Sequence, residues 1–153
     1  MTGLVLAGSI GIVAGLRTMT APAAIAWAAH LGWLSLDGSW LAFLGYRYTP
    51  MILTVLALAE FVADQLPGTP SRTVPMQFAA RIVSGTLCGG AIGIASGHPI
   101  AGSLAGAAGA VIGTLGGAAA RARIAASFGS DRPAAIVEDA TAIMAATLIA
   151  SAL

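Results

Sequence analysis

The stretch "GLRTMTAP", Gly15–Pro22, places an arginine, two threonines and a proline inside a long apolar run, Leu4–Leu34. As one straight helix, that run would measure about 46 Å at 1.5 Å per residue. The hydrocarbon core of a bilayer is only about 30 Å thick. In a continuous helix, Pro22 would remove one backbone hydrogen bond and clash with the carbonyl of Thr18. The sequence therefore predicts that the first helix is kinked or broken here, with Thr18 and Thr20 satisfying the freed backbone groups.

The composition indicates an integral membrane protein. The chain has 153 residues, of which 58% are hydrophobic and 8% are charged, and its mean hydropathy is +0.89. A soluble domain carries roughly 25% charged residues, so these side chains are too few to cover a surface in water. The net charge of +1 gives no reason to expect a nucleic-acid partner. The partner that the composition predicts is the lipid bilayer.

The apolar stretches predict an all-α bundle. A spanning helix needs about 20 apolar residues, so about five transmembrane helices fit into a single domain that covers residues 1–153. Each stretch is bounded by polar, glycine or proline residues. The five stretches are Leu4–Leu34, Pro50–Leu66, Met76–Gly97, Pro99–Ala120 and Pro133–Leu153.

The distribution of arginines predicts an orientation. Five spans place the two termini on opposite sides of the membrane. The N-terminal side then receives the expected loops 67–75 and 122–132, which contain Arg72, Arg123 and Arg132, whereas the other side has Arg47. Because cytoplasmic loops are enriched in basic residues, we expect the N-terminus in the cytoplasm and the protein in the bacterial inner membrane.

Glycines follow helical spacing in the third and fourth stretches. One series falls on every fourth residue, which is typical of close helix contacts in membranes. The other alternates between spacings of four and three, as along a heptad seam. These seams pack helices within one subunit or form the interface of a homo-oligomer. The residues are Gly85, Gly89, Gly93 and Gly97, then Gly102, Gly106, Gly109, Gly113 and Gly116.

Several charged residues are expected near one membrane face. Glu60 and Asp64 are four residues apart, so they share one face of their helix. The other four lie at the ends of the last three helices on the same side: Arg81, Arg121, Glu138 and Asp139. Charges in hydrocarbon are usually paired or face a cavity. The group is therefore a salt-bridge cluster that locks the helix ends, or a vestibule for a cation, proton or polar solute.

Arg17 is expected apart from that group. At 1.5 Å per residue it lies roughly 20 Å along the first helix, near the middle of the membrane. It stays away from the acidic residues unless the helix tilts or begins outside the core. Two roles remain open for Arg17. It caps carbonyls that are freed at the break, or it lies in a cavity where it attracts an anion or acts as a gate.

No catalytic or metal-binding set is evident. The single cysteine, Cys88, lies in an apolar run, and His30 and His98 are far apart in the sequence. No nucleophile and base, multi-cysteine site or phosphate-binding loop occurs. We therefore expect no enzyme activity and no cofactor.

Weak internal sequence similarity between two parts of the chain suggests an inverted repeat. "GIVAGLRTMTAPAAIA" and "GTLGGAAARARIAAS" each run from glycines into an arginine, and "ALAEFVAD" loosely matches "AIVEDATA". Helices one and two would then correspond to helices four and five. An offset of three spans reverses the orientation, as in an inverted repeat.

Several motifs resemble a bacterial membrane family, domain of unknown function 4126. They are "GLRTMTAP", "AEFVADQLPGTPSR", "FAARIVSG", "GAVIGTLGG" and "AIVEDATAI". The most specific parts are "AEFVAD" with its following proline and the late "ED" pair. The resemblance implies a small multi-span inner-membrane protein, and it implies no activity, substrate or catalytic residue.

Two functions follow from these observations. The leading hypothesis is a small transporter or channel for an ion or small polar solute that acts as a homo-oligomer. The alternative is a non-catalytic scaffold or accessory subunit of a larger membrane complex. The expected polar path consists of Arg17, Thr18, Thr20, Glu60, Asp64, Arg81, Arg121, Glu138 and Asp139.

Overall fold

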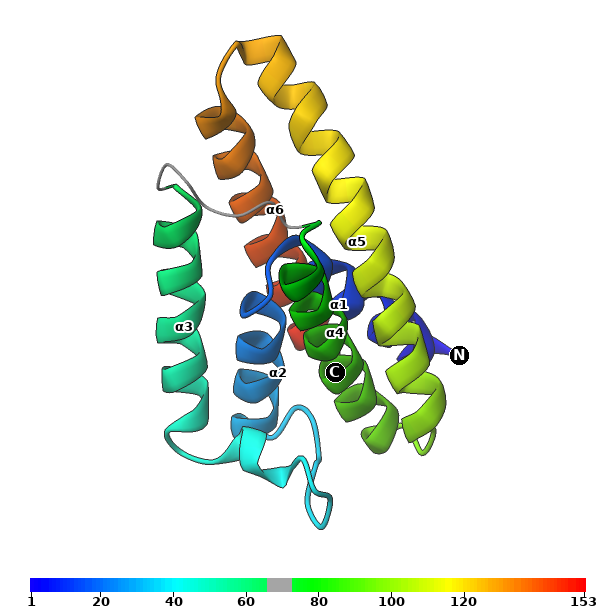
Figure 1. Ribbon diagram of the computed structural model, residues 1–153. Helices are drawn as coiled ribbons and strands as arrows, with labels where there is room; N and C mark the ends of the chain where they lie inside the picture. The colour runs from blue at the N-terminus through cyan, green and yellow to red at the C-terminus, as the bar shows by residue number, and fades with distance from the viewer. Residues whose placement is uncertain (66–72) are drawn as a thin grey trace.

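The computed structural model describes residues 1–65 and 73–153, and these form an all-helical bundle (Figure 1). The described residues contain six α-helices, one short 3-10 helix (η1) and no strand. The elements are α1 (Thr2–Leu16), α2 (Thr20–His30), η1 (Ala42–Gly45), α3 (Thr49–Asp64), α4 (Pro75–Ala95), α5 (Pro99–Phe128) and α6 (Asp131–Ser151).

Three of the described helices, α4, α5 and α6, are long and apolar enough to cross a membrane. This supports the expectation of a helical membrane protein. The expected count of about five spanning helices is not confirmed. The first stretch was expected to be a kinked or broken helix; a kinked helix is not confirmed, and the stretch forms two separate helices, α1 and α2, of 15 and 11 residues. Each is too short to span a hydrocarbon core of about 30 Å.

α1 and α2 form a hairpin that turns back inside the bundle. A Cβ placed on Gly8 would lie 3.8 Å from the Ala105 carbonyl oxygen, and one on Gly15 would lie 2.4 Å from that of Ala110. α1 therefore runs in the same direction as α5. Figure 1 shows α2 running from the middle of the molecule toward the end that holds η1. The tip of the hairpin, residues 17–19, consequently lies at mid-height.

The hairpin changes the expected topology. The first stretch makes no complete crossing, and the helices α3 to α6 alternate in direction along the bundle (Figure 1). Both termini lie away from the α5–α6 turn in Figure 1. This arrangement does not support termini on opposite sides of the membrane, and their sidedness stays a prediction. Arg123 and Arg132 flank that turn, so they lie opposite the N-terminus. The predicted cytoplasmic N-terminus was based on these arginines lying on the N-terminal side, so that argument no longer holds.

The proposed inverted repeat is wrong. It requires the helices of "GIVAGLRT" and "GTLGGAAARAR" to run in opposite directions. These sequences belong to α1 and α5, which run in the same direction. The first helix ends just before its arginine, whereas the second continues through its arginines as a helix.

Some helix ends differ from the sequence prediction. α5 continues to Phe128, so 122–132 is not a loop. It ends at Gly129, whose φ of 65° is left-handed, a conformation that glycine adopts without steric cost. Pro22 lies in the first turn of α2, where a missing N–H is tolerated, so it does not break a helix. In the predicted loop 67–75, residues up to 72 lie outside the described part of the chain.

Glycines bring α5 against both α4 and α1 within one chain. A Cβ on Gly106 would lie 2.1 Å from the Gly85 carbonyl oxygen, and one on Gly109 would lie 2.1 Å from that of Gly8. The helices therefore meet backbone to backbone. Gly97 does not belong to this contact, because it lies after α4 with a φ of 77° and nothing near its Cβ position. Association with a second copy stays a prediction.

Candidate functional site at the hairpin tip

The end of α1 is capped by Arg81 from α4. Arg17 is extended, with φ −140° and ψ 116°, so the helix stops there. The freed carbonyls of Gly15 and Leu16 accept hydrogen bonds from Arg81 Nη1, at 3.0 and 2.7 Å. The alternative in which Arg17 caps these carbonyls is therefore wrong. Arg81 performs this role, and its side chain is nearly fully buried.

The beginning of α2 is capped by Glu60 from α3. The backbone N–H groups of Thr18 and Met19 donate to Glu60 Oε1 and Oε2, each at 2.8 Å. Arg81 Nη2 lies 3.8 Å from Oε1 of the same carboxylate. Ser84 Oγ donates to the Thr18 carbonyl at 2.6 Å. Thr18 therefore contributes through its backbone rather than through the side chain that we expected to satisfy freed groups.

Arg17 lies among the acidic residues rather than apart from them. Its side chain is 0% exposed, and its guanidinium forms ion pairs with Asp64 of α3 and Asp139 of α6. The guanidinium carbon also lies 5.3 Å from the centroid of the Phe61 ring. The expected separation was wrong because the depth of Arg17 was counted along a continuous spanning helix. The hairpin instead delivers it to the level of the carboxylates.

Arg121 forms a second group near the α5–α6 turn. Its Nε donates to Asp131 Oδ1 at 2.9 Å, and its Nη1 lies 3.4 Å from Glu138 Oε2. The expected polar path thus comprises a group at the hairpin tip and a group at this turn. The charged group predicted from the sequence did not include Asp131, so its pairing with Arg121 was missed. The signal was an acid and an arginine on opposite sides of one helix connection.

Sequence reasoning also missed Ser84 and Phe61. Ser84 lies three residues after Arg81, so both project from one face of α4 toward the tip. Phe61 follows Glu60 directly. Thr20, which was predicted to satisfy backbone groups, is 7% exposed, and its Oγ1 has no hydrogen-bond partner among the described residues.

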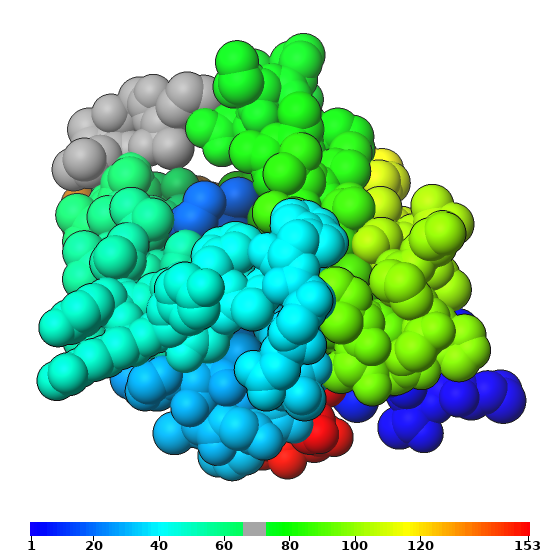
Figure 2. Space-filling view, turned by 90° about the horizontal axis from the view of Figure 1, so that it is seen from below, coloured from blue at the N-terminus to red at the C-terminus, as the bar shows by residue number. Residues whose placement is uncertain are grey.

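The carboxylates of the tip are more accessible than its arginine. The side chains of Glu60, Asp64 and Asp139 are 14%, 16% and 17% exposed, whereas that of Arg17 is 0% exposed. α3 packs against α2 and η1. Figure 2 shows a hollow between α3 and α4, with blue atoms of the N-terminal hairpin visible inside it. The three acidic side chains are therefore partly exposed, whereas the Arg17 side chain is enclosed.

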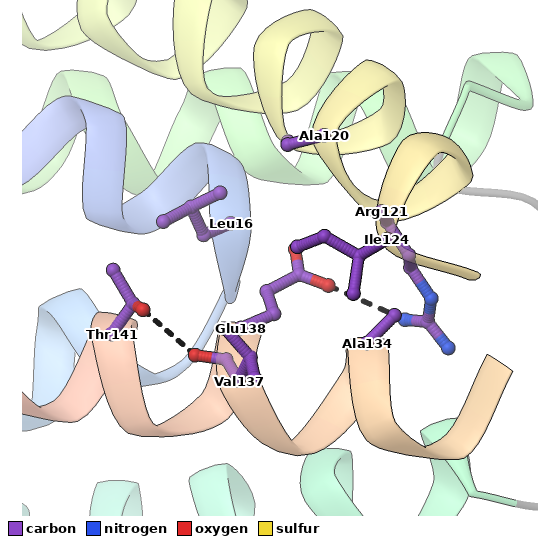
Figure 3. Close-up of a pocket in the computed structure, with 9 residues that line it drawn as sticks. Leu16, Ala120, Arg121, Ile124, Ala134, Val137, Glu138 and Thr141 are labelled. Atoms are coloured by element: carbon purple, nitrogen blue, oxygen red, sulfur yellow. Dashed lines mark hydrogen bonds and ion pairs between the residues drawn. The ribbon is translucent and has the colours of Figure 1, made fainter. Parts of the chain in front are cut away.

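An apolar pocket of about 120 Å³ lies between the end of α1, α5 and α6 (Figure 3). Leu16, the last residue of α1, lines it, and the Arg121–Glu138 pair lies at its edge. Neither Arg17 nor Glu60 lines this pocket. It is therefore separate from the charged centre at the tip. Within the described residues, no group of three or more histidine, cysteine or acidic side chains is arranged to hold a metal ion.

The comparisons with known proteins agree with the motifs in the sequence. The model of the family described as Domain of unknown function (DUF4126) matches residues 4–152. The chain belongs to this family. The match confirms the predicted resemblance, and the family brings no assigned activity with it. No curated protein and no solved structure matches the chain.

Proposed function

We propose that this family member is a small membrane transporter or channel that passes an ion or small polar solute beside the hairpin tip. One observation carries the proposal: Arg17 is fully buried between Asp64 and Asp139, which come from two different helices. On insertion scales, one such charge in the middle of a membrane costs about 2.5–3.5 kcal/mol. Ionisable groups at this depth are therefore typical of ion and substrate pathways.

The broken backbone at the tip supports the same function. Irregular backbone at membrane depth is tolerated only inside protein or beside a water-filled cavity. In many transporters, the ends of discontinuous helices hold the substrate and coupling ions near the membrane midplane. Here the last carbonyls of α1 and the N–H groups of the two residues that precede α2 lie together at residues 15–19. Such a site offers both donors and acceptors to a solute.

The proposal includes the bacterial inner membrane as the location and a homo-oligomer as the assembly. α3 exposes Met51, Val55, Leu58 and Val62 along one face, which suits contact with lipid or a second copy. The positive-inside rule favours a cytoplasmic α5–α6 turn, since Arg123 and Arg132 flank it. Both termini then lie on the outer face.

A flux measurement tests the proposed function. The purified protein is placed in liposomes that contain a pH-sensitive dye, and gradients of potassium chloride, sodium chloride and sodium formate are imposed. We expect flux above that of empty liposomes for at least one salt. Arg17→Lys keeps the charge but loses the planar fork that serves two carboxylates, and Asp139→Asn keeps the shape. Each should lower the flux at least tenfold.

Arg47→Lys is the matched control, because Arg47 is exposed and its guanidinium lies over Tyr48. We expect it to leave the flux unchanged. A folded wild-type protein with no flux in any of these salts would contradict the proposal, as would equal flux in Arg17→Lys and wild type.

A scaffold or accessory subunit is the second candidate. The favouring observation is that Arg17, Arg81 and Arg121 each join different helices within one chain. Such pairs would also serve as locks in a rigid, non-transporting protein. The scaffold predicts lower melting temperatures for Arg17→Lys and Asp139→Asn, together with no flux in the wild type.

A further inference from the structure

The beginning of α2 already holds one anion, the carboxylate of Glu60. Its two oxygens accept hydrogen bonds from two consecutive backbone N–H groups, those of Thr18 and Met19, each at 2.8 Å. Free N–H groups and the helix dipole make a helix N-terminus favourable for negative charge. Arg81, 3.8 Å from the same carboxylate, adds positive charge from the neighbouring helix.

A second observation indicates that Glu60 does not use all the donors at this place. Thr20, the first residue of α2, is 7% exposed, and its hydroxyl has no hydrogen-bond partner in the part of the chain that the structure describes. Arg17 Nε is buried and also lacks a hydrogen-bond acceptor there. A buried polar group without a hydrogen-bond partner destabilises the folded state. Residues 17–20 thus present two donors that Glu60 uses and two buried donors that have no acceptor among the described residues.

We propose that the N-terminus of α2 is a binding site for a small planar oxyanion of the carboxylate type, and that Glu60 occupies this site as a tethered substitute. The proposal rests on the proposed function and names the class of solute. A free carboxylate has the same two oxygens at the same separation as that of Glu60, so it fits the same pair of N–H groups. When the Glu60 side chain withdraws, the two N–H groups and Arg81 remain to hold the incoming anion.

The first test is a rescue experiment with formate as the probe. Glu60→Ala removes the carboxylate and leaves its space open, so we expect a lower melting temperature in detergent. Sodium formate should then restore at least half of the loss, and the effect should saturate. Sodium chloride at the same ionic strength should restore much less, because chloride cannot bridge both N–H groups with two oxygens.

Glu138→Ala is the matched control. Glu138 is a buried glutamate whose carboxylate pairs with the Arg121 side chain. Formate should not restore the melting temperature of this variant. The proposal is overturned if formate and chloride act equally on Glu60→Ala, or if formate restores both variants to the same degree.

Two further variants keep the proposal falsifiable if Glu60→Ala does not fold. Glu60→Gln keeps the shape but removes the competing charge, so it should bind formate at least tenfold more tightly than wild type in titration calorimetry. Adding Thr20→Val should weaken that binding severalfold by removing the unused hydroxyl. Equal binding by wild type and Glu60→Gln, or no binding by either, overturns the proposal.

The two proposals fail separately. If formate binds as described but no salt, formate included, crosses the liposome membrane, the oxyanion site stands and the transport function is wrong. If formate does not bind while another salt gives a flux that depends on Arg17, the transport function stands and the oxyanion site is wrong.

Discussion

Two buried regions of this molecule are held together in opposite ways. Where α5 meets α1 and α4, glycine backbones touch, and a Cβ on Gly109 would lie 2.1 Å from a neighbouring carbonyl oxygen. At the hairpin tip, Arg17, Arg81 and Glu60 join helices through charges and hydrogen bonds. The first region depends on shape and has no room for an added atom. The second region depends on charge, so the removal of one charged side chain leaves its ion-pair partner uncompensated.

The two regions meet at Gly15. A Cβ on this residue would lie 2.4 Å from the Ala110 carbonyl oxygen, and its own carbonyl accepts a hydrogen bond from Arg81 at 3.0 Å. The glycine contacts thus set the height at which α1 ends. The charged centre forms at that height, so the packing positions the site.

The largest expected effect is a change of shape in the first region. Gly89→Leu and Gly109→Leu place a side chain where a Cβ alone would lie 2.4 and 2.1 Å from a backbone oxygen. Overpacking a core costs roughly 1–3 kcal/mol when side chains can move, and here the backbone must move instead. We expect loss of folded protein, measured as monodisperse yield in detergent.

Gly116→Leu provides the control on the same helix, since a Cβ at Gly116 meets nothing within 4 Å. This variant should give the wild-type yield. If all three variants behave alike, the glycine contacts do not determine the fold.

The next largest effect is the loss of a charge in the second region. Arg17→Met leaves Asp64 and Asp139 without the cation that both of them contact. Removing one partner of a buried pair costs about 3–5 kcal/mol. The melting temperature in detergent should fall clearly for Arg17→Met and stay unchanged for Arg47→Met, whose arginine is exposed. Equal stability of the two variants would mean that the tip is not held by charge.

The smallest expected effect comes from one neutral hydrogen bond at the tip. Ser84→Ala removes the donor to the Thr18 carbonyl, which lies 2.6 Å from Ser84 Oγ. Such a bond contributes about 0.5–1.5 kcal/mol. Thermal unfolding should show a small loss for Ser84→Ala and none for Ser127→Ala, because Ser127 is exposed on α5. A loss as large as that of Arg17→Met would show that hydrogen bonds, not charges, dominate the tip.

Much of the helical framework follows from the sequence. The stretch Pro50–Leu66 corresponds to α3, and Met76–Gly97 and Pro133–Leu153 correspond to α4 and α6. Proline at the start and glycine or polar residues at the end mark these helices. The sequence placed Glu60 and Arg81 in one charged group, because charges in hydrocarbon are usually paired, but it did not predict this particular pair.

The hairpin does not follow from the sequence. A proline in the first turn of a helix and a proline inside one look alike in "TMTAP", so Pro22 predicted a kink or a break but not the reversal of direction that follows it. α2 is held by contacts between segments that are distant in the sequence: Trp27 Nε1 donates to Thr54 Oγ1 at 3.0 Å, and the Met19 N–H donates to Glu60 Oε2. The depth of Arg17 was then counted along the wrong path.

The topology of the termini tests the hairpin most directly. A compartment-sensitive reporter is fused in separate chains before Met1, after Leu153 and within the α5–α6 turn at Gly129. The hairpin predicts that the reporters at residues 1 and 153 lie in one compartment and the reporter at Gly129 in the other. Reporters at the two termini in opposite compartments would mean that the first apolar stretch crosses the membrane, and would contradict a buried tip at residues 17–19.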